Sequence, residues 1–543
     1  MRSRQRLLAF LAVAALLAGA ACHDDTGTTA PQPGDSGPRQ GGQVIVPLYA
    51  DLTTVNPYES TGEASEAEVL DLLFPSLMTE QPDYALHPPT FSPQLATSWE
   101  FSQDNRTLTF HLRSNARWSD GVPVTAEDVR FTFQVQRDRR VDWPNMDIKD
   151  FIDDVEVVDP HTVRFHFTRV YPYQLMDAND GPIIPAHVWG KIPLDRWRTT
   201  DFEPSLVTCG PFRLASHTPQ QTVVLERDPA YWGNPRPYLQ RLILRVIPDT
   251  ASQINQLIAG DIQLMPMVPP GDAARIRKDP DLEIVDFPSR AWGFIAWNNR
   301  SPLFSDRRVR RALTMAINRK VDVDTIYHGF ARLCNGPVLS SFWAYDKNLQ
   351  VLPYDPEAAK QLLAQAGWRD TNGDGVLDKN GRKFEFDLMY PATNTIRQEL
   401  GLLVQADLAR VGIRVRPLPV EYATLFARQE HGDYQAILAA WEEATKVDLS
   451  SEWSTANGSQ GGNNFLGYSN PEVDRLIAAA REEPDYTRAK VILDRIQELI
   501  VEDQPVTFMY EARQLVGINR RVRGADINAA SVFFNVDEWY WAP

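Results

Sequence analysis

Residues 93–133 read PQLATSWEFSQDNRTLTFHLRSNARWSDGVPVTAEDVRFTF. Strand-forming residues alternate on either side of the polar segment 102–105, which predicts two paired strands over 95–101 and 107–112. Acidic residues follow Thr125 within three positions, a pattern typical of a helix start. A strand pair that leads into a helix indicates a protein that combines both kinds of element.

The same mixture of elements extends along the chain in both directions. Alternating apolar residues predict further strands over 43–46, 155–159, 163–167, 222–226, 241–247, 292–298, 413–418 and 434–440. Helical periodicity predicts helices over 64–78 (interrupted at Pro75), 249–260, 307–317, 355–367, 395–411, 421–431, 470–481 and 486–503. The expected fold class is therefore α/β, with mixed sheets in more than one lobe.

The composition excludes several classes of protein. At roughly 150 residues per domain, the length of 543 residues predicts about three domains. Its 55 Lys and Arg against 71 Asp and Glu give a net charge of −16, which argues against nucleic acid, because phosphates need a basic surface. Three cysteines exclude a disulfide-dense scaffold and a multi-cysteine metal site.

The first 22 residues read as a secretory signal peptide, with three early arginines, an apolar run and then small residues. Cys22 ends a sequence like a bacterial lipobox, in which this cysteine receives a lipid, although Gly19 stands where leucine is usual. We favour a lipid anchor over ordinary cleavage, because residues 23–41 are polar and read as a flexible tether. The expected location is periplasmic or at the cell surface, with the membrane contacted only through Cys22.

Signatures of catalysis are missing from the sequence. It contains no G-x-x-x-x-G-K-[ST] phosphate loop, no G-x-S-x-G, no H-E-x-x-H and no C-x-x-C. The nine histidines have no pair at a helical metal-ligand spacing. We therefore expect no catalytic residue, no cofactor and no metal, although the many carboxylates leave a pair for sugar hydrolysis open.

One short segment has a metal-binding pattern. Residues 370–378 read DTNGDGVLD, which matches the first half of a calcium loop. The twelfth position of such a loop should hold a bidentate glutamate, and here it is Gly381. We favour a polar turn held by Asx side chains, with calcium as the alternative.

The segment 93–133 contains Leu-Ala, Ser-Trp, Phe-x-Leu-Arg, Trp-Ser-Asp-Gly and Ala-Glu-Asp-Val in that order. Further landmarks follow at 209–212 (CGPF), 231–232 (YW), 260–261 (GD), 307–313 (RRVRRAL), 362–368 (LLAQAGW) and 464–474 (NFLGYSNPEVD). Together they resemble the family 5 extracellular solute-binding proteins, the oligopeptide, dipeptide and nickel receptors of ABC importers. The resemblance covers nearly all of residues 42–525.

This resemblance implies a two-lobed periplasmic-binding-protein clamp. Residues 42–75, 200–295 and 511–543 would form the first lobe, residues 76–199 an extra domain packed on it, and residues 296–510 the second lobe. The predicted strand over 292–298 lies where the chain should pass between the lobes. The implied function is that of a receptor, not an enzyme.

As implied by the resemblance, the receptor captures an extended oligopeptide and delivers it to ABC permease subunits. We expect it to act as a monomer. The same clamp could instead bind an oligosaccharide or another non-peptide ligand, since 14 tryptophans leave room for sugar stacking. A secreted hydrolase is a remote alternative.

In peptide-binding relatives the ligand pairs with protein backbone as an added strand. The resemblance places one contacting segment after the Asn-Pro turn at Asn56 and the other after Trp441. An acid three residues after that tryptophan usually holds the peptide's α-amino group, but here that position is Ala444. Glu443 is the candidate to replace it, and a solvated acidic rim is the alternative. The predicted ligand-binding residues are Asn56, Tyr58, Glu59, Ser60, Trp297, Tyr390, Trp441, Glu442, Glu443 and Asp448.

Four further residues have two interpretations each. Lys446 and Arg290 are candidates to meet a ligand carboxylate, but salt-bridged or exposed cations are commoner. Export permits a disulfide between Cys209 and Cys334. We favour free cysteines, because a bridge between the lobes would restrain their opening.

Overall fold

The computed structural model describes residues 37–59, 64–234, 237–458 and 463–542. Among the described residues, Pro38 and all those that follow belong to one compact unit. The predicted signal peptide, Cys22, nearly all of the predicted tether and Ser60 lie outside the described residues. Within the described ranges, no helix combines the length and apolar character needed to cross a bilayer.

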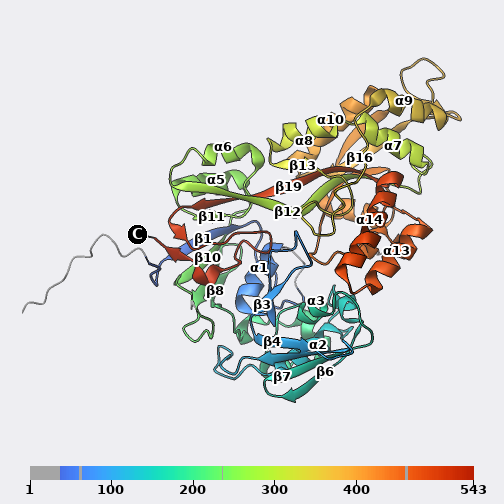
Figure 1. Cartoon of the computed structure of the whole chain (residues 1–543). Helices are drawn as coiled ribbons and strands as arrows, with labels where there is room; N and C mark the ends of the chain where they lie inside the picture. The colour runs from blue at the N-terminus through green and yellow to red at the C-terminus, as the bar shows by residue number, and fades with distance from the viewer. Residues whose placement is uncertain (1–36, 60–63, 235–236, 459–462, 543) are drawn as a thin grey trace, which may run out of the picture. The chain divides into compact units, whose positions relative to one another are not determined.

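The largest sheet among the described residues has seven strands, in the order β11-β19-β12-β18-β16-β17, with β13 paired to β19. Its two long strands, β12 (Leu282–Trp297) and β19 (Val506–Asn519), run antiparallel and side by side (Figure 1). β16 pairs in parallel with β17 and β18, so the sheet is mixed, as predicted. The remaining strands are β11 (Leu264–Met265), β13 (Ala331–Leu333), β16 (Glu385–Pro391), β17 (Arg414–Val420) and β18 (Ala436–Glu442).

A four-stranded sheet, β1-β10-β9-β8, joins the start of the compact unit to a segment more than 160 residues later in the chain. β1 pairs in parallel with β10, and β8, β9 and β10 form an antiparallel meander. Helix α5 follows, with its N-terminus capped by Asp249, which accepts a 2.7 Å hydrogen bond from the Ser252 amide. The elements are β1 (Gln43–Leu48), β8 (Phe212–Thr218), β9 (Thr222–Arg227), β10 (Arg241–Val246), α5 (Thr250–Ala259), η4 (Pro270–Asp272) and α6 (Ala273–Ile276).

The stretch that opens the sequence analysis forms the strand pair and helix predicted for it. β4 and β5 belong to an antiparallel sheet, β4-β5-β7-β6, and helix α2 starts after Thr125. The Asp128 carboxylate accepts a 2.8 Å hydrogen bond from the Thr125 amide, which is the expected capping contact. The elements are β4 (Ala96–Phe101), β5 (Thr107–Leu112), α2 (Ala126–Gln136), β6 (Ile152–Asp159) and β7 (Thr162–Phe167).

Shorter elements surround this sheet and close the chain. β2 pairs with β3, and β20 pairs with β21 near the C-terminus. The bounds are α1 (Ala64–Leu73), β2 (Met78–Glu80), β3 (Phe91–Pro93), η1 (Met146–Lys149), α3 (Gln174–Asn179), α4 (Ala186–Trp189), η2 (Leu194–Thr199), η3 (Glu203–Ser205), β20 (Val522–Arg523), η6 (Val536–Glu538) and β21 (Tyr540–Trp541).

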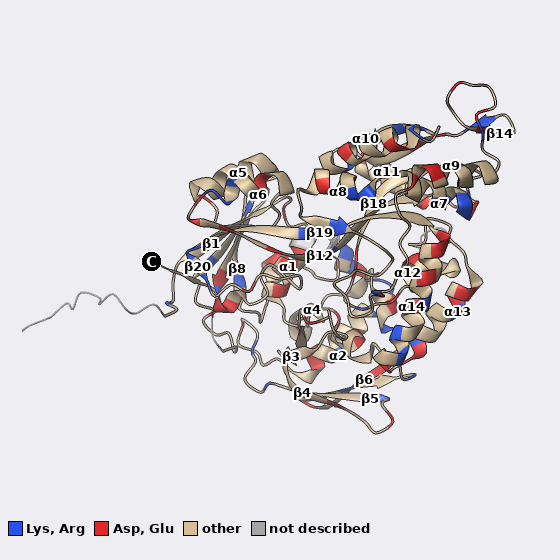
Figure 2. Ribbon diagram, turned by 45° about the horizontal axis from the view of Figure 1, so that its top comes forward, with Lys and Arg blue, Asp and Glu red and all other residues tan. Residues whose placement is uncertain are grey.

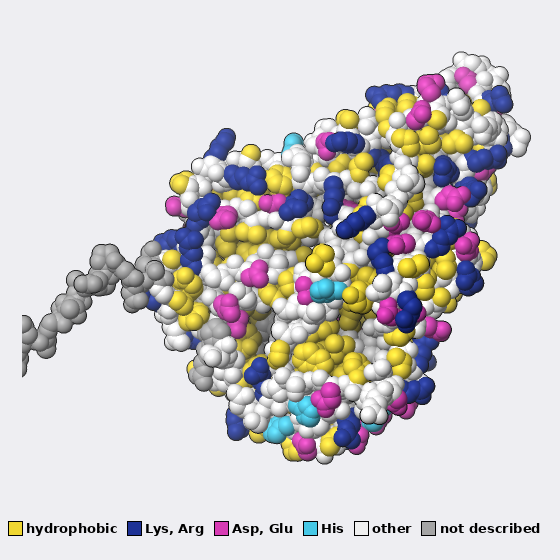
Figure 3. Space-filling view, in the orientation of Figure 1, with side chains coloured by type: hydrophobic (Ala, Val, Ile, Leu, Met, Phe, Trp, Pro, Cys, Tyr) yellow, Lys and Arg dark blue, Asp and Glu magenta, His cyan; other side chains and the backbone are white. Residues whose placement is uncertain are grey.

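Helices cover the β16–β18 side of the large sheet. All six predicted there are present, and α8 is an additional helix that the sequence analysis did not predict. Charged residues are distributed along α13 and α14 in Figure 2, and both signs are interspersed over the face in Figure 3. The elements are α7 (Arg307–Ala316), α8 (Arg319–Tyr327), α9 (Pro356–Gln365), β14 (Asp378–Lys379), β15 (Arg382–Lys383), α10 (Thr395–Ala409), α11 (Tyr422–Glu430), α12 (Ser450–Trp453), η5 (Thr455–Gly458), α13 (Pro471–Glu482) and α14 (Tyr486–Asp503).

The long strands pass from one set of hydrophobic clusters to another. In β12, Val285 and Phe287 pack against the cluster built on β1, β5 and β10, whereas Trp292 and Phe294 belong to a cluster with α13 and α14. The pairing with β19 shifts register between Pro288 and Trp292. The change from one set of clusters to the other lies between Phe287 and Trp292, and we call this part of β12 the crossing.

Candidate ligand-binding cavity

A cavity of about 450 Å³ lies against the crossing. Its walls come from segments far apart in the sequence: α1, β2, the segment around η1 and α3, the crossing strand β12, and the loop after β18. The contributing residues are Pro57, Tyr58, Ala67, Asp71, Ser76, Glu80, Phe91, Trp143, Asn145, Ile148, Met176, Asp177, Asn179, Asp180, Gly181, Pro182, Arg290, Ala444, Thr445 and Lys446. The two segments that the family resemblance placed at the ligand, after Asn56 and after Trp441, thus reach the same cavity.

Helix α1 presents Ala67 and Asp71 to the cavity, four residues apart and so on one helix face. The amides of Cys209 and Gly210 donate to the Leu73 carbonyl over 3.2 and 2.9 Å, which satisfies the C-terminal end of the helix. A side chain at Gly210 would place its Cβ 2.2 Å from the Leu72 carbonyl oxygen. The Cys-Gly-Pro motif therefore fixes the helix that carries Asp71.

Asp71 is an unpaired acid of the cavity. Its side chain is open to the cavity, and no partner for its carboxylate is found among the described residues. Burial raises its pKa to about 7, and the negative charges of Glu68 and Asp180 add to the effect. No cation is among the groups that perturb this pKa.

Two other acids of the cavity have partners for their carboxylates, and a third lies beside a lysine. Asp177 is buried and receives Lys446 Nζ at 2.9 Å, while the Glu80 side chain is hydrogen-bonded by Thr445. The Asp180 carbonyl accepts a 2.7 Å hydrogen bond from the buried ammonium of Lys149, whose pKa burial lowers to about 8. Lys149 thus lies beside Asp180, whereas Asp71 has no comparable neighbour in the described part of the chain.

Of the described residues predicted near the Asn-Pro turn, one lines the cavity, one is buried in the turn and one lines a neighbouring hollow. Tyr58 lines the cavity, and its hydroxyl donates to the Pro182 carbonyl at 2.5 Å while it accepts from Gln136 at 3.1 Å. Asn56 is fully buried and accepts a 3.1 Å hydrogen bond from the Tyr58 amide, so it shapes the turn. Glu59 lines a neighbouring hollow with Arg198, and burial raises its pKa to about 7.

The predicted acids after Trp441 point elsewhere than the cavity. Trp441 packs against Phe294 at a centroid distance of 4.4 Å, within an aromatic cluster. Glu442 is exposed and pairs with Arg290 at 3.4 Å. Glu443 accepts a 2.6 Å hydrogen bond from Trp292 Nε1, and burial, together with Glu452, raises its pKa to about 7.

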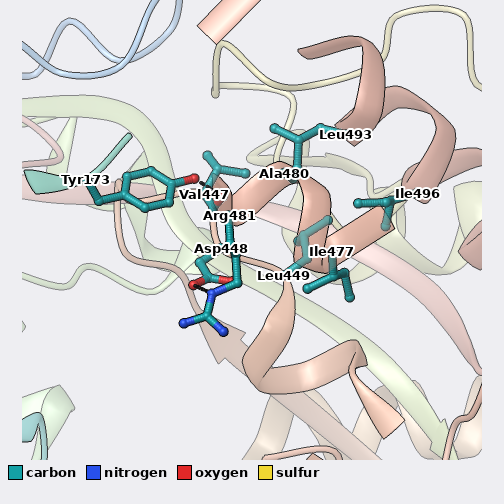
Figure 4. A pocket seen from close by; sticks show the side chains of 9 residues that line it. All are labelled: Tyr173, Val447, Asp448, Leu449, Ile477, Ala480, Arg481, Leu493 and Ile496. Atoms are coloured by element: carbon teal, nitrogen blue, oxygen red, sulfur yellow. Dashed lines mark hydrogen bonds and ion pairs between the residues drawn. The ribbon is translucent and has the colours of Figure 1, made fainter. Parts of the chain in front are cut away.

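Three other predicted residues lie away from the cavity walls. Trp297 is fully buried and donates a 3.1 Å hydrogen bond to Thr507, and Tyr390 packs in the same hydrophobic cluster. Both strands that carry them are covered on both faces, so an aromatic residue there packs in the core. Asp448 pairs with Arg481 at 3.2 Å in a crevice of only about 10 Å³, where Tyr173 donates to the Val447 carbonyl (Figure 4).

Residues 90–463 match the family described as bacterial extracellular solute-binding proteins, family 5 Middle. The chain belongs to this family. Its resemblance to that family in the sequence is thus confirmed, as is the two-lobed mixed α/β fold. Family 5 is a family of extracellular solute-binding proteins rather than of enzymes.

Two relatives and one solved structure illustrate the family. The chain is 29% identical to the oligopeptide-binding protein AppA of Bacillus subtilis over 553 aligned residues, covering 100% of both chains. It is 24% identical to the dipeptide-binding protein of Escherichia coli, covering 80% of this chain and 83% of that one. The structure of B. subtilis AppA in complex with a nonapeptide superposes with a TM-score of 0.81 at 28% identity, over 93% of this chain and 100% of that chain.

The remaining sequence predictions for this family 5 protein concern cations, cysteines and calcium. Lys446 and Arg290 line the cavity but are salt-bridged, as the commoner interpretation predicted. Cys209 and Cys334 are free and buried in different hydrophobic clusters, so the disulfide alternative does not hold.

The 370–378 segment forms the polar turn that we favoured. Asp370 accepts from the amides of Gly373 and Gly375 at 2.8 and 3.0 Å, and Asp374 is bound by Lys383. Across the described residues, no group of three or more His, Cys, Asp or Glu side chains could hold a metal ion.

Sequence reasoning missed the acids Asp71, Glu80, Asp177 and Asp180. In the sequence each reads as an ordinary polar position on a helix, strand end or loop. Only Asp71 carried a usable local signal: it is flanked by Leu70 and Leu72 in a mostly apolar helix.

Proposed function

We propose that this protein is an extracytoplasmic receptor that captures an extended oligopeptide in the cavity and delivers it to an ABC permease. The observation that carries the proposal is the lining of one cavity by Tyr58, after the Asn-Pro turn, and by residues 444–446, after Trp441. These are the two segments that the family resemblance assigns to peptide contact. The full-length similarity to an oligopeptide-binding protein supports the same ligand class.

The proposed division into lobes follows the hydrophobic clusters. Residues 42–75, 200–295 and 511–543 are the first lobe, residues 296–510 the second, and residues 76–199 the extra domain. Two clusters contain mainly residues of the first lobe and extra domain, and two contain mainly residues of the second lobe. Ligand contacts with both lobes would favour the closed clamp, because closure is a hinge motion that the ligand's differential contacts drive.

We assign the proposed ligand contacts to Tyr58 and the backbone of residues 444–446, with Asn56 and Trp441 as supports of the two segments. Backbone pairing in the manner of an added strand would accept many peptide sequences. For the N-terminal segment, we propose signal-peptide cleavage before Cys22 and lipidation of that residue, with residues 23–41 as tether. Metabolic labelling with a radioactive fatty acid, compared between wild type and Cys22→Ala, tests the anchor.

Native mass spectrometry tests the receptor function. Residues 23–543, which include the whole compact unit, would be purified gently from a bacterial host, and the bound material would be released by denaturation and identified. We expect short peptides of mixed sequence. A single oligosaccharide, or an empty protein that peptides fail to stabilise against heat, would refute peptide capture.

A further inference from the structure

We propose that Asp71 is the anchor for an ammonium group of the ligand, in place of the second-lobe acid that is absent at Ala444. This inference rests on the proposed receptor function and names the chemistry that the same cavity selects. The carboxylate that binds the ligand's ammonium would thus lie on helix α1 of the first lobe instead of on the loop after β18.

The second lobe offers no free acid at the expected place. Ala444 has no charge, and each nearby acid is held elsewhere. Glu442 pairs with Arg290 at 3.4 Å, and Glu443 accepts from Trp292 Nε1 at 2.6 Å. Asp448 pairs with Arg481 at 3.2 Å beside a crevice too small for a ligand. A ligand ammonium in the cavity would therefore be left without a carboxylate from this loop.

The first lobe supplies the missing carboxylate. Asp71 lines the cavity that Ala444 also lines, and it has no hydrogen-bond or ion-pair partner within the described ranges. Nearby, the buried Oδ2 atom of Asp180 also lacks a hydrogen-bond partner there. The Asp71 carboxylate is open to the cavity, where water can solvate it; a ligand that fills the cavity displaces that water and has to offer a partner in its place, because burying a charge without one is unfavourable.

An ammonium is the group that best meets these oxygens. Its three N–H donors suit carboxylate acceptors, and its positive charge offsets the local excess of acids. The neighbours that act on Asp71 electrostatically are Glu68 and Asp180, both negative, so the site disfavours a second anion. The ammonium has two possible sources, the free α-amino group of a peptide or a basic side chain such as lysine.

The raised pKa of Asp71, about 7, agrees with this geometry. A carboxylate without a cation holds its proton more tightly, and a bound ammonium would release that proton. This shift supports the assignment, which stands on the contacts alone.

Isothermal titration calorimetry at pH 8 tests the assignment with residues 23–543. The three probes are an alanine pentapeptide with a free amino terminus, its N-acetylated form, and an N-acetylated form that contains one lysine. We expect wild type to bind the free amine about ten- to a hundredfold more tightly than the acetylated peptide, the range for a hydrogen bond to a charged group. Asp71→Asn should abolish that difference.

Glu443→Gln is the matched control, because Glu443 is a buried acid with a similarly raised pKa that faces Trp292 instead of the cavity. It should keep the preference for the free amine. Thermal unfolding of each variant checks that it is folded. If the lysine peptide alone binds tightly and Asp71→Asn removes that binding, the anchor holds a side-chain ammonium.

Two outcomes overturn the inference while the receptor function stands. In one, peptides bind and Asp71→Asn keeps the full preference for the free amine. In the other, wild type binds free and acetylated peptides equally and gains nothing from lysine. If no peptide binds to wild type, the proposed function fails and the inference fails with it.

Discussion

Replacing Asp71 by asparagine should stabilise the ligand-free protein at pH 8. The pKa of Asp71 is raised from 3.8 to about 7 in the folded state, so folding favours the protonated form. Relative to the ionised form, protonated Asp71 adds to the free energy of unfolding below about pH 4. This contribution is lost as the pH rises towards 7 and is absent above pH 7. Asparagine does not ionise, so the variant avoids the free-energy cost of an unpaired negative charge at pH 8.

The magnitude follows from the shift and from the position of the side chain. About three pKa units correspond to at most about 4 kcal/mol at pH 8, but Asp71 is open to the cavity and solvent screens its charge. We therefore expect Asp71→Asn to gain about 1–2 kcal/mol at pH 8, and the gain to shrink towards zero near pH 4.

Guanidinium unfolding of the ligand-free protein at pH 4, 6 and 8 measures this gain. Asp249→Asn is the control, because Asp249 is an exposed helix cap and asparagine caps helices equally well. Hydrogen bonds from Ser252 lower the pKa of Asp249, so the stability that its charge adds is present above about pH 4, and Asp249→Asn should show no gain in stability at pH 8. An Asp71→Asn variant that is no more stable than wild type at pH 8, or whose gain does not change with pH, would contradict an unpaired carboxylate at this position.

Three further predictions follow from the described contacts. Affinity for a peptide with a free α-amino group should fall about fourfold from pH 8 to pH 6 in calorimetry, because ionised Asp71 drops from about nine-tenths to about one-tenth of molecules while the protonated share of the amine rises from about four-tenths to nearly all. Lys446→Gln should lower the free energy of unfolding by about 3 kcal/mol in guanidinium unfolding, because it leaves the buried Asp177 carboxylate without its cation. The double variant with Asp177→Asn should recover part of this loss. Cys209 and Cys334 should react with a thiol reagent only after denaturation, because burial raises the pKa of both thiols; reaction in the native state would contradict their packing.

The elements that the sequence predicted are those with a local cause. The strands on either side of residues 102–105 and the helix after Thr125 depend on alternation and capping within a few residues. Strand β19 was missed because charged residues interrupt its apolar run. Glu511, in its middle, is bound by Arg332 at 2.8 Å and by the Ser340 amide at 3.2 Å, and both partners are distant in sequence.

The candidate site was harder to predict because a side chain's direction depends on tertiary packing. Trp297 and Tyr390 are aromatic residues on strands near the expected cleft, yet both sides of those strands are covered and both residues pack in the core. Glu443 stands one position from the expected anchor, and a one-residue step along an extended segment turns the side chain to the opposite side. Asp71 has leucine neighbours in a mostly apolar helix, but only the tertiary packing shows that its side chain faces a cavity.

The contrast between Asp71 and its neighbours argues for a ligand more strongly than the acidity of the cavity does. Asp177, Glu442 and Asp448 each have a cation within 3.4 Å, and Glu443 has a donor at 2.6 Å. Asp71 departs from this pairing in the cavity where the Oδ2 atom of Asp180 also lacks a hydrogen-bond partner. Local rules of polar pairing are broken chiefly at functional sites, where the missing partner arrives with the ligand. The Cys209 and Gly210 amides bind the Leu73 carbonyl at the end of α1, and a bound ammonium would supply the charge that the protein itself omits.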